Sequence, residues 1–251
     1  MSDDLFSLSG KTILITGSAG HIGRLLVEQF TRAGASVWEM DKPDSLAYSN
    51  ALFLPVDLSD GDSIAGSVKP MLASVDRLDG FVHCAAYVGT SQLPGWLGDL
   101  SEQSRETFDA ALDVNLGSVF SLVKALLPVF DDSSLVFLSS IYGSVGPDFS
   151  LYEGTQMDNP LAYGVSKAGL NQLSRYLANR YAGVLRSNAL VLGGVERGQP
   201  ANFIKRYCER TPLSRMAIEA DIVGPVQFLL SDAARYITGT ELPVDGGFLA
   251  R

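Results

Sequence analysis

The hydrophobic residues of this 251-residue chain fall into short apolar runs that alternate with segments of helical periodicity. The first run is followed by a glycine-rich turn and then by hydrophobic side chains at helical spacing, and this order recurs along the chain. The runs predict strands at 11–16, 36–40, 51–56, 80–84, 135–138, 186–191 and 243–245. The periodic segments predict helices at 24–33, 62–73, 107–130, 163–181 and 220–230.

Strands that alternate with helices are typical of a parallel sheet whose two faces are both covered by helices. The sequence has no internal repeat, low-complexity tract or linker. The pattern therefore predicts an α/β protein with a doubly wound, seven-stranded parallel sheet, folded as a single domain over residues 1–251.

Composition supports a globular chain, because 46% of the residues are hydrophobic and 19% are charged. A net charge of −9 argues against nucleic acid or an anionic membrane as a partner. The start lacks the features of a signal peptide, and no apolar run reaches membrane-spanning length. Cys84 and Cys208 indicate two reduced thiols rather than a disulfide framework. We therefore expect a cytoplasmic protein.

The turn after the first strand reads Thr16-Gly17-Ser18-Ala19-Gly20-His21-Ile22-Gly23. Glycines there let backbone N–H groups approach a pyrophosphate, and the following helix directs its positive end at the phosphates. An ordinary helix-entry loop would also explain the glycines, but the position between strand and helix favours a dinucleotide site. We expect cofactor contacts from Gly17, Ser18, Gly20, His21, Ile22 and Gly23.

Asp41 closes the second predicted strand, where a carboxylate can bind the adenosine ribose hydroxyls and repel a 2′-phosphate. The alternative is a solvated loop acid. The residue predicts NAD in preference to NADP, although Lys42 beside it leaves room for the phosphorylated cofactor.

Small residues end the fourth predicted strand in His83-Cys84-Ala85-Ala86, which suits a strand end that lies against a cofactor. Ala85 and Ala86 therefore join the predicted cofactor site. For His83 we expect a core histidine that is hydrogen-bonded to backbone, because no second metal ligand lies at useful spacing.

Tyr163 and Lys167 lie one helical turn apart, so both side chains share a helix face. A phenol titrates near pH ~10, but an ammonium and an oxidised nicotinamide both favour phenolate and lower that pKa. Tyr163 could then take a proton from an alcohol while hydride leaves the same carbon, or donate a proton to a carbonyl in reverse.

Two further polar residues stand near this pair in the predicted fold. Ser140, at the end of the fifth strand, could bind the substrate oxygen and help to hold the Tyr163 hydroxyl. Asn115 lies inside a predicted helix, where its amide could interrupt backbone bonding and hold a water near Lys167. Ordinary turn or helix polarity explains each residue equally well when it is taken alone.

Together these residues resemble the short-chain dehydrogenase/reductase superfamily over essentially the whole chain. The glycine turn is followed, in the family's order, by Asp41, Asp57, Asn115, Ser140, Tyr163 and Lys167. The C-terminal part of the chain is similar to the signature of the classical subgroup, since it contains Ile237-Thr238-Gly239 and Val244-Asp245-Gly246-Gly247. The resemblance implies a Rossmann fold, NAD(P)(H), a Ser–Tyr–Lys–Asn catalytic group and a homotetramer or homodimer. It adds four expected cofactor contacts, Asp57, Leu58, Gly194 and Val195.

The chain also departs from the family's usual pattern. His21 replaces the second glycine of the turn, with Gly20 one residue earlier, as in the extended subgroup. Gly193-Gly194 replaces the usual Pro-Gly after the sixth strand. The insert between Ser140 and Tyr163, from Tyr142-Gly143 to Tyr152-Glu153-Gly154, resembles a bacterial group associated with flagellin glycosylation and legionaminic-type acid synthesis. This suggests a sugar or a sugar phosphate as substrate.

The predicted substrate segment, residues 194–216, is rich in basic side chains and holds few acids. It could bind an anionic substrate such as a sugar phosphate. The alternative, which we favour, is an amphipathic helix with salt bridges. The basic residues are Arg197, Lys205, Arg206, Arg210 and Arg215, set against Glu196 and Glu209.

The sequence thus predicts an NAD(H)-dependent alcohol/ketone oxidoreductase that acts on a sugar-derived substrate in bacterial surface-glycan biosynthesis. A 3-oxoacyl reductase or a polyol dehydrogenase is the alternative on the same scaffold. A nucleotide-sensing binding protein is the alternative from another class, but its site should have lost Tyr163 or Lys167, and the chain retains both. Residues 114–130 are apolar around nearly the whole helix, so we expect a second subunit to cover this helix and 163–181.

Overall fold

The computed structural model describes residues 4–47, 52–87 and 93–251, and its centre is a seven-stranded sheet in the order β3-β2-β1-β4-β5-β6-β7. All neighbouring strands pair in parallel, and the chain runs outward from β1 to β3 and then from β4 to β7. This order confirms the predicted doubly wound sheet. The strands are β1 (Thr12–Thr16), β2 (Ser36–Asp41), β3 (Leu52–Pro55), β4 (Gly80–His83), β5 (Ser133–Ser140), β6 (Leu185–Leu192) and β7 (Glu241–Val244).

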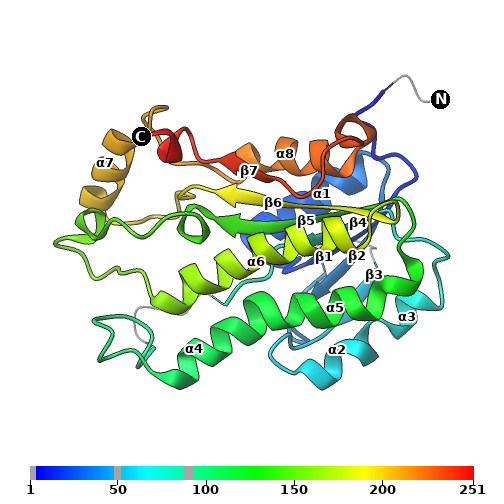
Figure 1. Cartoon of the computed structure of the whole chain (residues 1–251), viewed down its shortest axis with the longest axis horizontal. Helices are drawn as coiled ribbons and strands as arrows, with labels where there is room; N and C mark the ends of the chain where they lie inside the picture. The colour runs from blue at the N-terminus through cyan, green and yellow to red at the C-terminus, as the bar shows by residue number, and fades with distance from the viewer. Residues whose placement is uncertain (1–3, 48–51, 88–92) are drawn as a thin grey trace.

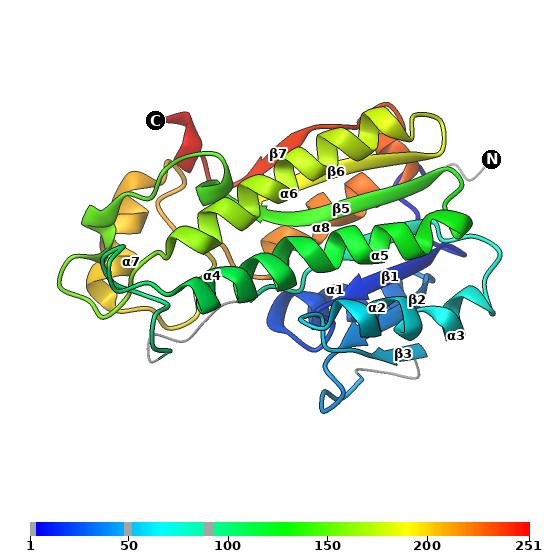
Figure 2. The same ribbon diagram turned by 60° about the horizontal axis from the view of Figure 1, so that its bottom comes forward.

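Helices cover both faces of the sheet (Figures 1 and 2). The α-helices are α1 (His21–Arg32), α2 (Gly61–Ser67), α3 (Lys69–Leu72), α4 (Arg105–Leu112), α5 (Ser118–Leu126), α6 (Leu161–Arg180), α7 (Ala201–Arg210) and α8 (Ala220–Leu230). A π-helical segment, η1 (Asp113–Gly117), joins α4 to α5. The 3-10 turns are η2 (Leu127–Val129), η3 (Ile141–Gly143), η4 (Phe149–Tyr152), η5 (Asp232–Ala234) and η6 (Phe248–Ala250).

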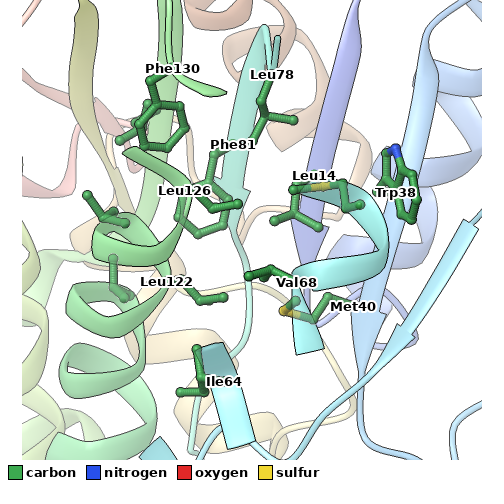
Figure 3. Packing of buried hydrophobic residues seen from close by; sticks show 14 of the residues in the cluster. Leu14, Trp38, Met40, Ile64, Val68, Leu78, Phe81, Leu122, Leu126 and Phe130 are labelled. Atoms are coloured by element: carbon green, nitrogen blue, oxygen red, sulfur yellow. The ribbon is translucent and has the colours of Figure 1, made fainter. Parts of the chain in front are cut away.

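Successive strand residues point to opposite faces, so each strand contributes to two hydrophobic clusters. Leu14 and Phe81 pack with Leu122 and Leu126 of α5 on one face (Figure 3). Their strand neighbours, such as Ile13, pack with α1 and α8 on the other face. Burial on both faces explains why the strands read as continuous apolar runs rather than as alternating ones.

Several predicted boundaries are wrong. The helix predicted at 62–73 is two helices, because Pro70 lacks an N–H and marks the start of α3. The helix predicted at 107–130 is interrupted by η1, and the last strand lies at Glu241–Val244 instead of 243–245. A helix also forms at Ala201–Arg210, which the sequence suggested only as the alternative to a basic patch.

The helical run Arg105–Val129, which α4, η1, α5 and η2 form together, is long and apolar enough to cross a membrane by length and composition. This finding corrects the expectation that no apolar run reaches that length. Within the run, Val119, Leu122 and Leu126 are fully buried against the sheet. Packing against the sheet therefore accounts for part of the apolar character of the run.

Candidate active site

The carboxyl ends of the parallel strands meet at one edge of the sheet, which is where open α/β sheets bind their ligands. Helix α7 lies beyond the carboxyl ends of β5 and β6 (Figure 1). The structure brings most of the predicted site residues to this edge. They are the glycine turn after β1, Asp41 in β2, Ala85 and Ala86 after β4, Ser140 in β5, and Gly194 and Val195 after β6.

Two glycines of the first turn stand where a side chain has no room. Gly17 has a φ of +65°, and a Cβ on it would lie 2.6 Å from the backbone nitrogen of Ala85. A Cβ on Gly23 would lie 2.1 Å from the carbonyl oxygen of Gly17. The glycines therefore bring β1, α1 and the end of β4 into direct backbone contact.

The N-terminus of α1 is suited to an anion. Gly20 precedes the helix in extended conformation, and within the described residues no side chain caps it. The first N–H groups of a helix lack partners inside the helix. Those of His21, Ile22 and Gly23 can therefore donate hydrogen bonds to phosphate oxygens. The Ser18 Oγ is buried and has no hydrogen-bond partner among the described residues.

Asp41 ends β2 directly beside this turn. Its carboxylate accepts the backbone N–H groups of Ala19 and Lys42, each at 2.8 Å, and the Ser45 hydroxyl at 3.2 Å. These contacts hold a negative charge at the end of β2. An open helix terminus, an unpartnered buried hydroxyl and a fixed carboxylate together fit a dinucleotide, with its pyrophosphate at α1 and a ribose at Asp41.

The neighbouring Asp57 is turned back on its own loop. Its carboxylate accepts the Ser59 N–H at 2.9 Å and the Ser59 hydroxyl at 2.8 Å, and these bonds lower the pKa of Asp57. Leu58 is buried beneath it. In this conformation Asp57 is an exposed, ionised residue at the rim of the predicted cofactor site.

His83 is fully buried in β4, as we expected, but its partner is a side chain and not the backbone. Its Nδ1 shares a 2.8 Å hydrogen bond with the Thr16 hydroxyl of the adjacent strand. Burial lowers the pKa of His83 to about 3, with a smaller contribution from the charge of Lys167. The ring is therefore neutral and links β1 to β4.

Lys167 lies in the middle of α6 with only 4% of its surface exposed. Its Nζ donates to the Leu138 carbonyl at 2.7 Å and lies 5.7 Å from the centre of the Tyr163 ring. Burial lowers the pKa of Lys167 to about 8. The ammonium thus stands below the phenol and is anchored to β5.

The Ser140 side chain acts on the Tyr163 phenol. Burial raises the pKa of Tyr163, while the Ser140 hydroxyl and the charge of Arg197 lower it less strongly. This corrects our expectation that the neighbouring ammonium lowers the phenol pKa. In the free protein Tyr163 is a protonated donor at neutral pH.

Asn115 occupies the π-helical segment η1, so the helix is interrupted where the sequence suggested. Its Oδ1 accepts the Tyr87 N–H at 2.5 Å, and its Nδ2 donates to the Ser166 hydroxyl at 2.9 Å. These bonds reach the residue beside Lys167 rather than Lys167 itself. Asn115 therefore ties the segment after β4 to α6.

Helix α7 supports the site in a way that the sequence did not predict. The Tyr207 hydroxyl accepts the N–H of Gly194 at 2.5 Å, and its ring stacks on Phe203 and Phe248 at centroid distances of 6.0 and 5.1 Å. Phe203 and Tyr207 are one helical turn apart in a polar segment. That spacing was the available sign of a helix with one buried face.

The basic segment around α7 is internally paired, which confirms the favoured alternative and corrects the idea of an anion-binding patch. Arg206 donates to two backbone carbonyl oxygens. The other basic residues pair with acids, as Arg197–Glu219, Lys205–Glu209, Arg210–Asp148 and Arg215–Asp221.

Comparison with known proteins gives matches over nearly the whole chain. A family model described as enoyl-(acyl carrier protein) reductase matches residues 17–249. The post-translational flagellin modification protein A of Campylobacter coli is 29% identical over 258 residues, which cover 96% of this chain and 99% of that protein. A tropinone reductase homologue of Arabidopsis thaliana is 30% identical over 270 residues, 98% of this chain and 95% of that protein.

A solved structure of a short-chain dehydrogenase from Leptospira borgpetersenii, with bound NAD+, is also similar. It has a TM-score of 0.84 and 28% sequence identity, and the match covers 99% of this chain and 96% of that one. The similarity therefore includes both the glycine turn and the region after β5.

Proposed function

The chain belongs to the short-chain dehydrogenase/reductase family, and we propose that it is an NAD(H)-dependent oxidoreductase that interconverts a secondary alcohol and a ketone. As a family member it is an NAD(P)-dependent enzyme that acts on a small molecule. One observation carries the finer proposal. The Ser140–Tyr163 hydroxyl pair lies above the buried Lys167, at the sheet edge that also holds the glycine turn.

The nicotinamide ring, when bound, supplies or accepts the hydride. Tyr163 holds the proton that the substrate oxygen gains or loses, and Ser140 can hydrogen-bond the same oxygen. The raised pKa of Tyr163 suits donation of a proton to a carbonyl. In the oxidative direction Tyr163 must first lose its proton, which the Ser140 hydroxyl and the charge of Arg197 favour. Asn115 positions α6 through Ser166.

We propose NAD(H) as the preferred cofactor because of Asp41. Three hydrogen bonds fix its carboxylate at the end of β2, where a 2′-phosphate would meet a like charge. The neighbouring Lys42 is exposed and presents only its backbone N–H to Asp41.

We propose a sugar-derived substrate in bacterial surface-glycan biosynthesis. The flagellin modification protein of Campylobacter coli supports this, because it matches this chain over nearly its full length. An acyl-carrier substrate is the second candidate, favoured by the description of the family model and by an NADH-dependent enoyl reductase of Nostoc at 28% identity. A cytoplasmic location stays a prediction from the sequence.

We also propose a homo-oligomer that forms through α5 and α6, which run side by side (Figures 1 and 2). The fold covers most apolar residues of α5, so the expectation of an apolar surface all round this helix was too broad. Phe120 is still 61% exposed, and Tyr176 of α6 is 59% exposed. Phe120→Lys should lower the mass seen by light scattering, whereas Leu46→Lys should not. A monomeric wild-type protein at micromolar concentration would refute this proposal.

The enzyme proposal is tested with purified protein and a panel of hexoses, hexose phosphates and a 3-oxoacyl thioester, each with NAD(H) and NADP(H). Tyr163→Phe should lower turnover by about 10²–10⁴, because it removes the proton-transfer group. Binding of NADH, followed by fluorescence, should stay close to that of the wild type, since the ring is kept. Near-normal turnover in this variant would contradict the mechanism.

A further inference from the structure

We propose that the hydroxyl groups of Tyr142 and Tyr152 form a second polar contact in this site, which binds a hydroxyl group of an uncharged, polyhydroxylated substrate. The inference rests on the proposed function, because it names the substrate class of the same site. Both tyrosines belong to the insert between β5 and α6.

The backbone of Tyr142 packs directly against the catalytic residues. Its N–H donates to the Ser140 hydroxyl at 3.2 Å. Its carbonyl oxygen would lie 3.0 Å from a Cβ on Gly164, and a Cβ on Gly143 would lie 2.7 Å from the backbone of Lys167. Turn η3 therefore rests on the part of α6 that carries the reaction, and Tyr142 extends from this contact.

The side chain of Tyr152 meets that of Tyr142 from the other end of the insert. The Tyr152 hydroxyl donates to the Tyr142 hydroxyl at 2.8 Å. Its ring packs against Phe203 of α7 at a centroid distance of 5.3 Å, and only 9% of the residue is exposed. The position of the two hydroxyl groups is thus fixed by η3, η4 and α7 together.

Arg206 fixes the backbone on both sides of Tyr152. Its guanidinium donates to the carbonyl of Leu151 at 2.9 Å and to that of Glu153 at 2.6 Å. A guanidinium that donates to two carbonyl groups in this way stabilises the backbone conformation and is not a free cation. Rotation of η4 away from the site would break both bonds.

The direction of the hydrogen bond between the two tyrosines leaves the Tyr142 hydroxyl free to donate. The Tyr152 phenol donates its proton to the Tyr142 hydroxyl. The Tyr142 hydroxyl proton has no acceptor among the residues that the structure describes. Burial raises the pKa of both phenols, so each keeps its proton at neutral pH. Tyr142 can therefore donate to a ligand oxygen.

Two observations relate this pair to the reacting centre and to an uncharged ligand. The Ser140 hydroxyl accepts the Tyr142 N–H, so the turn that carries Tyr142 begins at the reacting centre. The nearby arginines are paired with acids, Arg210 with Asp148 and Arg197 with Glu219. Because these two cations are already neutralised, the site favours a hydroxyl group over a phosphate or a carboxylate.

The test compares two probes that share a six-membered ring, free hexoses and cyclohexanol, which has one hydroxyl only. Tyr142→Phe should lower kcat/KM for the hexose about two- to tenfold, mainly through KM, as expected for the loss of one hydrogen bond. It should leave cyclohexanol oxidation and NADH binding unchanged. Tyr152→Phe should act in the same direction, and Tyr236→Phe, at a fully exposed tyrosine, is the matched control.

The outcomes separate this inference from the proposed function. Equal losses on hexose and cyclohexanol would assign the tyrosines a purely structural role and overturn the inference. Preference of the wild-type enzyme for hexose 6-phosphates over free hexoses would overturn the uncharged class. Binding of NADH without turnover of any alcohol or ketone would overturn the proposed function itself, and the inference with it.

Discussion

The cofactor end of the site is built from backbone atoms, whereas the substrate end is built from side chains that come from distant parts of the sequence. At the first, Gly17 and Gly23 let three chain segments touch without any side chain between them. At the second, Tyr152 is placed by Phe203 and Arg206, from a helix some fifty positions further on. A site that is built from backbone atoms restricts the residue type at single positions. A site that is built from side chains depends on several residues at once, which lie far apart in the sequence.

The largest effect should follow from Gly23→Ala. The new Cβ would lie 2.1 Å from the Gly17 carbonyl oxygen, so the backbone itself must move. We expect a loss of stability of about 3 kcal/mol or more and a matching loss of NADH binding, measured by denaturation and by fluorescence titration. Gly66→Ala in α2, where a Cβ meets open space, is the control. Wild-type NADH affinity in Gly23→Ala would show that the turn is not built as described.

Asp41→Asn tests the charge at the cofactor end, because it keeps the size of the side chain and one acceptor oxygen and removes the negative charge. The wild-type preference for NAD over NADP should amount to about 1–3 kcal/mol, or ten- to hundredfold, and the variant should lose most of it. Titration of both cofactors measures this. The exposed Asp44→Asn should keep the wild-type ratio. Equal binding of both cofactors by the wild type would remove the assigned role of Asp41.

Lys167 lies between the two ends, and its burial makes a prediction about pH. Its pKa of about 8 lies below its ordinary value, so the folded state binds fewer protons there than the unfolded state. The cost of burying the charge is therefore full below pH 8 and fades as pH rises above it. Relative to Lys167→Met, the wild type should gain about 2 kcal/mol in unfolding free energy from pH 7 to pH 9.5.

Denaturant unfolding of both proteins at the two pH values checks this difference. Lys11→Met, at a lysine whose salt bridge with Asp232 is partly exposed, serves as the control. A constant difference between wild type and Lys167→Met across this range would mean that Lys167 is not buried as a charged group.

The smallest effect should come from Arg206→Met at the substrate end. Loss of the two carbonyl bonds frees the backbone around Tyr152, while the stem of the side chain keeps its packing. We expect KM for a hexose to rise about threefold, with kcat and NADH binding unchanged, as for a hydrogen bond of modest worth. Lys205→Met, at the exposed neighbouring position, is the matched control. A fall in NADH affinity would show that the two ends are not separate.

Much of the cofactor end could be predicted because its signals are local. The strands are buried on both faces and read as apolar runs, and the glycines mark positions that backbone contact restricts. The order of Ser140, Tyr163 and Lys167 could also be read from the chain, and the structure brings these residues together.

The rest depends on distances that a sequence does not contain. The raised pKa of Tyr163 follows from burial, which exists only once the sheet and α6 have packed. The hydrogen bond between Tyr142 and Tyr152 and the bonds of Arg206 join segments whose spacing along the chain gives no hint of contact. Only Phe203 and Tyr207, one turn apart in α7, offered a local sign of a buried face.

Gly193 and Tyr207 are in steric contact, so each restricts the residue type at the other position. A Cβ on Gly193 would lie 2.9 Å from the Tyr207 hydroxyl oxygen and 2.9 Å from the Asp245 Cα. The proline that is usual at this place in the family would therefore collide with Tyr207 in its present position. A larger residue at position 193 would require a smaller one at position 207, so we expect the two positions to change together among close relatives. A chimaera that receives α7 from this protein would also need a glycine at position 193.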